Sequence, residues 1–355
     1  MSKKTPLHQA HIDLKALLVD FSGWQMPLHY GSQIEEHHAV RKNAGLFDVS
    51  HMGVIDITGP DAISFLRYVL TNDIHKLKNS GDALYTCMLN YQGGIIDDLI
   101  VYRFTNEYFR LVVNAGCRDK DFDWLQTQST KFSVKINWRE DCLLALQGPN
   151  SLEYLNFIFD KPIIQKVKNL KSFQCVHLED QDIVIAKTGY TGEIGVEMML
   201  PEKLAIEIWK KLIAAGVKPC GLGSRDTLRL EAGLNLYGVD MTEKTSPWIS
   251  NLAWTVALQD ISRDFIGKQA LQAEKQNGIT EKLVGLKLET RGVLRNHQTV
   301  RIDGVGLGEI TSGSFSPTLN HAIALARIPV TDKTEATVER RGDWLPVKIV
   351  KTRFI

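Results

Sequence analysis

Residues 85–102 have the sequence YTCMLNYQGGIIDDLIVY, in which a glycine-rich turn separates two apolar runs. This pattern predicts a β-hairpin, because apolar runs favour strands and Asn-Tyr-Gln-Gly-Gly favours a tight turn. Two aspartates, Asp97 and Asp98, lie in the middle of the second run. Side chains alternate between the two faces of a strand, so Asp97 shares a face with Leu99 and Asp98 shares the other with Tyr102.

If either face packs on a core, a carboxylate lies among aliphatic side chains, where an unpaired charge is costly. Such an acid is either paired or has a raised pKa, and it can handle protons or bind a cationic or N–H-rich ligand. The alternative is an edge strand with both carboxylates near solvent. The pattern alone leaves both interpretations open.

The overall composition is that of a globular protein. The chain has 355 residues, of which 44% are hydrophobic and 23% charged, and its formal net charge is +1. This length predicts two or three domains, and the charge balance argues against nucleic-acid or membrane partners. The five cysteines form no Cys-x-x-Cys pair, which predicts reduced, buried thiols. With no signal-peptide pattern at the start, we expect a cytoplasmic protein; a mature mitochondrial form is the alternative.

Helical and strand patterns follow one another without a regular βαβ alternation. Ser32 and Glu35 form a capping box before residues 34–42, and Pro60 opens a second helix with an apolar stripe. Consecutive strand candidates are joined by hairpin-length turns, and longer helical segments fall between groups of strands. This order predicts the α+β class with antiparallel sheets.

The character of the sequence changes near residues 274–281, a polar segment that contains a glycine and is expected to be a linker. After it come short apolar runs broken by glycines, at residues 282–288, 300–302, 308–311, 323–328 and 345–350. This spacing predicts a small β-barrel or sandwich.

The segment 187–197, KTGYTGEIGVE, joins two predicted strands through a turn with three glycines, which permit close backbone approach. Glu197 then falls inside an apolar strand. Either it contributes to a binding site or it is one paired glutamate beyond an ordinary turn.

Arg225 is expected in the first turn of a helix that Ser224 caps, where a cation opposes the helix dipole. It therefore needs a partner, which is either a buried carboxylate of the protein or an anionic ligand. No set of side chains has convincing metal-ligand spacing, so we expect no metal site.

Many short motifs, spread over the whole chain, are together specific. They include residues 23–27 (GWQMP), 45–53 (GLFDVSHMG), 93–98 (GGIIDD), 146–149 (LQGP), 188–193 (TGYTGE), 221–226 (GLGSRD) and 308–313 (GEITSG). In this order the chain resembles the aminomethyltransferase, or T-protein, family of the glycine cleavage system. The resemblance implies a three-domain cloverleaf with a ferredoxin-like second domain and a C-terminal β-barrel.

The resemblance also implies domain boundaries. Domain 1 is a discontinuous folate-binding domain of residues 1–52 and 142–273. Domain 2, residues 53–141, consists of an antiparallel sheet with helices and carries the catalytic aspartate. Domain 3 is the barrel of residues 282–355.

The implied reaction transfers the methylene carbon from aminomethyl-lipoyl H-protein to tetrahydrofolate, with release of ammonia and formation of 5,10-methylenetetrahydrofolate. Lipoylated H-protein is then the partner, the lipoyl group being carried by it, and tetrahydrofolate is the co-substrate. By position, Asp98 matches the catalytic aspartate. The cofactor-binding positions match Glu197, Arg225, Tyr190, Tyr85, Tyr102 and Asn114.

Two alternatives use the same scaffold. One is another folate-dependent demethylase or one-carbon transferase. The other is a non-enzymatic folate-binding protein linked to iron–sulfur maintenance, but such proteins have a cysteine where this chain has Gly189. Family members usually continue past the last barrel strand with a short tail that touches folate, whereas this sequence stops at Ile355.

Overall fold

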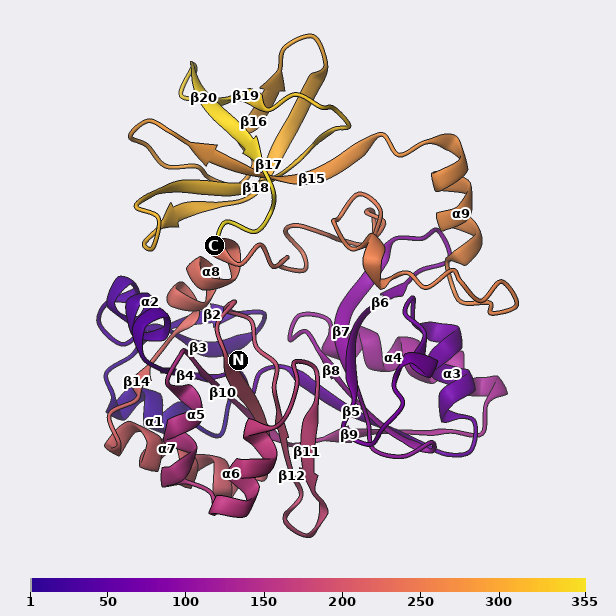
Figure 1. The fold of residues 1–355 in the computed structure, drawn as a ribbon, viewed down its shortest axis with the longest axis vertical. Helices are drawn as coiled ribbons and strands as arrows, with labels where there is room; N and C mark the ends of the chain where they lie inside the picture. The colour runs from indigo at the N-terminus through magenta and orange to yellow at the C-terminus, as the bar shows by residue number, and fades with distance from the viewer. Residues whose placement is uncertain (1) are drawn as a thin grey trace. The chain divides into compact units, whose positions relative to one another are not determined.

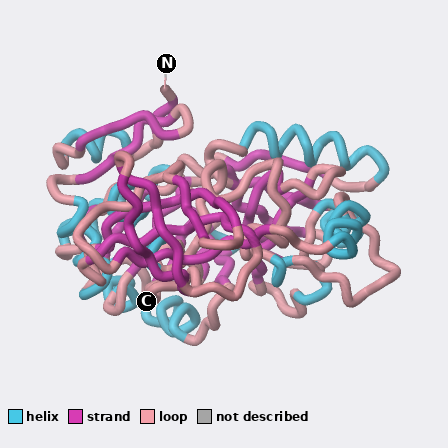
Figure 2. The backbone as a smooth tube through the Cα atoms, turned by 90° about the horizontal axis from the view of Figure 1, so that it is seen from above, coloured by secondary structure: helices cyan, strands magenta, loops and turns pink. Residues whose placement is uncertain are grey.

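The structure, a computed structural model, describes residues 2–355 and consists of helices and strands joined by loops (Figure 2). The chain divides into two units. The first comprises Met1–Leu66, Ile74–Tyr85 and Leu99–Asp226, and the second comprises Arg67–Asp73, Thr86–Asp98 and Thr227–Ile355. The predicted α+β class is confirmed, with mostly antiparallel pairing in the larger sheets and the barrel.

The chain begins with a small sheet of order β1-β3-β2, formed by β1 (Lys3–Lys4), β2 (Leu17–Phe21) and β3 (Trp24–His29). Helix α1 (His8–Asp13) precedes β2, and α2 (Gln33–Lys42) follows β3. The predicted cap of α2 is present, because the Ser32 hydroxyl accepts a hydrogen bond from the Glu35 N–H at 3.3 Å.

A six-stranded sheet of order β11-β12-β13-β10-β4-β14 forms the largest layer of the first unit. All its pairs are antiparallel except that of β14 with β4. Apolar side chains from this sheet pack with Trp209 and Leu212 of α7. The elements are β4 (Gly45–Asp48), β10 (Cys142–Gln147), β11 (Cys175–Leu178), β12 (Ile183–Ala186), β13 (Gly195–Leu200), β14 (Lys218–Pro219), α5 (Ser151–Tyr154), α6 (Lys161–Lys168), α7 (Glu202–Ala214) and the 3₁₀ turns Leu155–Phe157 and Glu179–Gln181.

A five-stranded antiparallel sheet has the order β6-β7-β8-β5-β9. Without β6, the chain path β5-α3-β7-β8-α4-β9 has the strand order of a ferredoxin-like fold, as predicted. The expected hairpin of residues 85–102 is the β6–β7 connection. The elements are β5 (Gly53–Thr58), α3 (Ala62–Val69), β6 (Ala83–Leu89), β7 (Ile95–Arg103), β8 (Tyr108–Val113), α4 (Arg118–Gln128), β9 (Lys135–Arg139) and the 3₁₀ turns Ile74–Lys76 and Ser129–Lys131.

The C-terminal strands close into a barrel of order β15-β18-β17-β16-β19-β20, in the orange and yellow part of Figure 1. Its core holds Leu286, Val300 and Val338. The strands are β15 (Glu281–Leu288), β16 (Thr299–Ile302), β17 (Gly306–Ser316), β18 (His321–Pro329), β19 (Glu335–Arg340) and β20 (Asp343–Val350). Strand β19 was missed by the sequence analysis, because only Ala336 and Val338 turn inward and its other residues are polar.

Three helical segments lie between β14 and the barrel: α8 (Leu222–Glu231), the 3₁₀ turn Ala253–Thr255 and α9 (Lys268–Asn277). The expected linker at residues 274–281 was partly wrong, because its first half is the last turn of α9. The helix is held there by Leu271, whose side chain is fully buried and whose carbonyl accepts the Trp248 indole N–H at 2.9 Å.

Two further features bear on earlier expectations. The five cysteines are free and buried, as predicted. Among residues 2–355, no helix has the length and apolar character needed to cross a bilayer.

Candidate functional site

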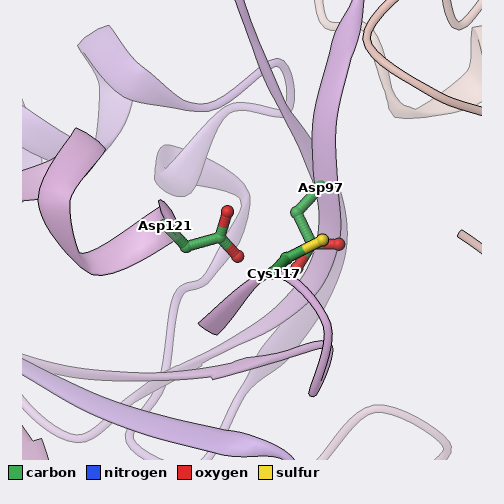
Figure 3. A group of neighbouring side chains, drawn as sticks. All are labelled: Asp97, Cys117 and Asp121. Atoms are coloured by element: carbon green, nitrogen blue, oxygen red, sulfur yellow. The ribbon is translucent and has the colours of Figure 1, made fainter. Parts of the chain in front are cut away.

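The aspartate pair lies on β7, a strand with neighbours on both sides, so the edge-strand alternative is wrong. Asp97 is 0% exposed and shares its face with buried Leu99 and Val101, whereas Asp98 is half-buried on the opposite face. Figure 3 shows the Asp97 side chain projecting from the strand. Of the two carboxylates, Asp98 is therefore the one that a ligand can reach.

The negative charges on β7 affect a thiol of the same unit. Burial raises the pKa of Cys87 on β6, and the carboxylates of Asp98 and Asp97 raise it further. The thiol is thus kept protonated and is no candidate nucleophile, because the thiolate is the reactive form.

Glu197 lies on β13 and is half-buried. Its carboxylate is the final acceptor of a hydrogen-bond chain that runs through two hydroxyl groups. The Thr188 hydroxyl donates a hydrogen bond to Glu197 Oε2 at 2.6 Å. Since the Thr188 hydroxyl proton is already donated to Glu197, the Tyr102 hydroxyl must be the donor in its 3.4 Å hydrogen bond with Thr188 Oγ1. Tyr102 is 1% exposed, and burial, followed by the charge of Glu197, raises its pKa well above the usual value.

Glu197 Oε1 accepts no hydrogen bond from any other part of the described chain. A carboxylate oxygen with open lone pairs, half-shielded from water, is a strong acceptor for an N–H-rich ligand.

Arg225 lies in the first turn of α8, with its guanidinium carbon 4.6 Å from the centre of the Tyr190 ring. Burial lowers its pKa, while Glu197 and Tyr190 act in the opposite direction. Its Nη1 atom is buried and has no hydrogen-bond partner among residues 2–355. The half-buried carboxylate of Glu197 is thus an electrostatic partner of Arg225. One guanidinium nitrogen still lacks an acceptor, which an anionic or carbonyl-bearing ligand would supply.

The predicted start of α8 was wrong. The helix begins at Leu222 rather than Arg225, and the Ser224 hydroxyl donates to the Gly221 carbonyl at 2.9 Å instead of capping the helix. Glu36 of α2, which is 0% exposed, accepts hydrogen bonds from the N–H groups of Gly221 and Tyr30 at 2.9 and 2.6 Å. Its carboxylate lies at the positive end of α8 and so offsets the cation of Arg225 there.

Sequence analysis missed Glu36, although a signal was present. It precedes the buried Val40 of α2 by four residues and therefore falls on the inner face of that helix. Burial raises the pKa of Glu36, and the hydrogen bonds from Gly221 and Tyr30 lower it in part.

A second buried group surrounds Asp48, at the end of β4. Its carboxylate accepts hydrogen bonds from the Thr5 hydroxyl at 2.7 Å, from His11 Nε2 at 2.9 Å and from the Ser50 N–H at 2.9 Å. Burial alone would raise the pKa of Asp48, but these hydrogen bonds and the charge of His11 lower it below its usual value. A shallow recess lies beside it, lined by Met26, Pro27, Phe47, Asp48, Cys220, Gly221, Leu222 and Arg225.

His51, in the β4–β5 connection, is 4% exposed, and its Nδ1 atom has no hydrogen-bond partner among residues 2–355. Burial lowers its pKa to about 4; Asp48 opposes this change, and Arg225 and Arg118 add to it. His51 is therefore neutral in the folded protein at pH 7.

The free energy of unfolding is expected to decrease as the pH falls from about 6.5 to about 4. In that window the unfolded chain protonates His51, with its ordinary pKa of 6.5, and the folded protein does not. The shift corresponds to about 3 kcal/mol over the whole window. Urea unfolding of the wild type and of His51→Gln at several pH values between 7 and 4.5 checks this, because the stability difference between the two proteins should change with pH. Parallel stability curves would contradict it.

The remaining predicted residues lie on the five-stranded sheet. Tyr85 is half-buried on β6, and Asn114 is half-buried just after β8, where its carbonyl accepts the Cys117 N–H at 3.0 Å. Hydrogen bonds, a ring contact and an electrostatic contact thus connect Tyr102, Tyr190, Glu197 and Arg225 within the first unit, while Asp98 belongs to the second unit.

Comparisons with known proteins identify the family. Residues 7–260 match the GCVT N-terminal domain, and residues 281–355 match the glycine cleavage T-protein C-terminal barrel domain. An aminomethyltransferase of Pseudomonas syringae pv. tomato is 52% identical over 356 residues, which cover 100% of this chain and 98% of that protein.

Among solved structures, the glycine cleavage system aminomethyltransferase T from Bartonella henselae has a TM-score of 0.92 and 35% identity, and the match covers 100% of this chain and 98% of that one. Both the sequence and the fold therefore agree over the full length. The chain belongs to the aminomethyltransferase, or T-protein, family of the glycine cleavage system, enzymes that act on aminomethyl groups.

Proposed function

We propose that this enzyme takes the methylene carbon from an aminomethyl group on the lipoyl arm of H-protein and passes it to tetrahydrofolate. The carbon loses its bonds to the amine nitrogen and to the lipoyl sulfur, and it gains bonds to N5 and N10 of the folate. The two protons released from these nitrogens balance the ammonia and the thiol that leave. The products are 5,10-methylenetetrahydrofolate, ammonia and dihydrolipoyl H-protein.

The observation that carries this proposal is the group formed by Glu197, Arg225 and Tyr190. It combines an open carboxylate oxygen, a buried guanidinium nitrogen without an acceptor, and an aromatic ring stacked with that guanidinium. A reduced pterin offers N–H donors for the carboxylate and a flat ring system for aromatic contact. Folate also has carbonyl and carboxylate oxygens that an arginine can bind.

We assign Glu197 to the N–H donors of the pterin and Arg225 to oxygen atoms of the folate. Tyr102 would act through Thr188, because its hydroxyl points along the hydrogen-bond chain that ends at Glu197. Tyr190, Tyr85 and Asn114 would line the ligand, the tyrosines with ring area and the asparagine with an amide.

We assign the catalytic role to Asp98. Its carboxylate is half-buried on the more open face of β7, so its charge is partly shielded from water. There it would orient the attacking folate nitrogen and stabilise positive charge that develops as ammonia leaves. The protein then contributes positioning and electrostatics, without a covalent nucleophile.

Four lysines on or near α7, at 203, 210, 211 and 218, form a candidate docking surface for H-protein, but their ion pairs argue against it. Lys211 pairs with Glu207 at 2.7 Å, and Lys218 lies 3.7 Å from Glu35. Because acids neutralise half of this group, it is a mixed-charge surface rather than a basic patch.

Ammonia release with aminomethylated H-protein and tetrahydrofolate tests the proposal. Ammonia and methylenetetrahydrofolate should form in equal amounts, and omission of either substrate should reduce the rate to background. Folate binding without turnover would instead support the non-enzymatic alternative. Equal rates with and without tetrahydrofolate would show that the acceptor is wrong.

A further inference from the structure

We propose that Gln147 is a positioning residue that holds the turn of residues 187–194 in the geometry that binds folate. This inference rests on the proposed function and extends it to a residue that touches none of the reacting atoms. Gln147 is the last residue of β10, and its side chain is fully buried.

The Gln147 amide is bonded to both ends of the turn. Its Oε1 accepts a hydrogen bond from the Thr191 hydroxyl at 3.0 Å. Its Nε2 donates toward the Thr188 carbonyl at 3.1 Å and the Val196 carbonyl at 3.3 Å. One side chain thus forms hydrogen bonds with the beginning of the turn at Thr188, with its middle at Thr191 and with the following strand at Val196.

Two glycines make room for this amide. A Cβ atom on Gly189 would lie 1.9 Å from Gln147 Oε1, and one on Gly195 would lie 2.5 Å from Nε2. Two of the three glycines for which the sequence predicted a close backbone approach, Gly189 and Gly195, therefore approach the side chain of Gln147. The turn can pack over the amide only with glycine at these positions.

Arg41 of α2 holds the outer side of the same turn. Its Nη1 donates to the Thr191 carbonyl at 2.7 Å and to Glu193 Oε1 at 2.9 Å. Thr191 is fully buried between the two groups, with its hydroxyl on Gln147 and its carbonyl on Arg41.

The turn carries two residues of the candidate site. Thr188, whose carbonyl is bonded to Gln147, directs its hydroxyl to Glu197. Tyr190, which precedes Thr191, places its ring on Arg225. A shift of the turn would move the ring and the hydroxyl together, and small displacements of positioned groups cost much binding energy.

The test is Gln147→Met, which keeps the length of the side chain and removes all its hydrogen bonds. We expect the KM for tetrahydrofolate and the Kd from a folate titration to increase about tenfold, which is the loss of roughly one or two neutral hydrogen bonds. The value of kcat at saturating folate should stay within about threefold, because Asp98 is unchanged. A merely structural residue would lower the fraction of active enzyme, and so kcat, without a change in KM.

Two substitutions of Thr191 form a matched pair of variants. They test the same inference if Gln147→Met does not fold. Thr191→Val removes the hydroxyl that Gln147 Oε1 accepts, and Thr191→Ser keeps it. We expect Thr191→Val to raise the Kd for folate several-fold and Thr191→Ser to restore it. Gln181→Glu, at an exposed position beside β12, is the control that should leave both constants unchanged.

Hydrogen exchange of residues 187–194 distinguishes a wrong role for Gln147 from a wrong proposed function. Faster exchange in Gln147→Met and Thr191→Val than in the wild type, measured without folate, supports the role of Gln147 in holding the turn. Unchanged exchange, or folded variants with a wild-type Kd, would overturn the inference. If the wild-type protein binds no tetrahydrofolate, the proposed function is refuted. The role of Gln147 in folate binding is then refuted as well.

Discussion

Asp98→Asn is expected to lower kcat by about 10²- to 10⁴-fold, the range in which a positioned acid–base group contributes. Asparagine has nearly the same shape but carries no charge, so it can no longer stabilise a developing cation on the substrate. The KM for tetrahydrofolate should change little, because Glu197, Arg225 and Tyr190 remain. Steady-state ammonia release with saturating substrates measures the effect.

Asp97→Asn is the matched comparison on the same strand. Asp97 faces the core and is 0% exposed, so its replacement should affect thermal stability more than turnover. We expect its kcat to stay within about tenfold of the wild type, well below the 10²-fold threshold for proton-transfer roles. If Asp98→Asn also stays within tenfold, or if the two variants lose turnover equally, the assignment of Asp98 is wrong.

Glu197→Gln is expected to weaken tetrahydrofolate binding about 10- to 100-fold, the value of a hydrogen bond to a charged group. The glutamine oxygen can still accept the bond from Thr188, but an NH₂ donor then replaces the open oxygen and faces the N–H groups of the pterin. Removal of the negative charge also deprives Arg225 of the carboxylate that offsets its burial. Isothermal titration with tetrahydrofolate measures the change without any contribution from H-protein.

Glu202→Gln is the control for this variant. Glu202 is exposed at the beginning of α7, directly after the strand that carries Glu197, so it makes the same chemical change away from the site. Its Kd for folate should equal that of the wild type. An equal loss in both variants would show a nonspecific charge effect, and no loss in Glu197→Gln would exclude Glu197 from the folate site.

The hairpin of residues 85–102 and the short strands of the C-terminal region were predictable because their signals are local. A turn such as Asn-Tyr-Gln-Gly-Gly acts over five residues, and apolar alternation requires only that one face of a strand be buried. Strand β19 was not predicted because just two of its six residues, Ala336 and Val338, turn inward. Alternation so short cannot be distinguished from a loop.

The site residues show a similar division. Glu197 and Arg225 stood out because a charge in an apolar strand, or a cation at the wrong end of a helix, needs a partner whatever the fold. The position of Glu36 on the inner face of α2 was readable from the sequence, but nothing near Glu36 or Gln147 in the sequence shows what they contact. Their partners are far away along the chain: Gly221 for Glu36, and Thr188 and Thr191 for Gln147.

The sequence by itself determined the α+β class, the barrel and the family, since each depends on short-range patterns or on the order of motifs. Only the tertiary structure decided which of two adjacent aspartates is buried, where α8 begins and what Gly189 and Gly195 of the turn approach. Each of these depends on strand neighbours and on side chains from distant segments. Packing and hydrogen bonding between such segments form only when the chain is folded, and no local pattern encodes them.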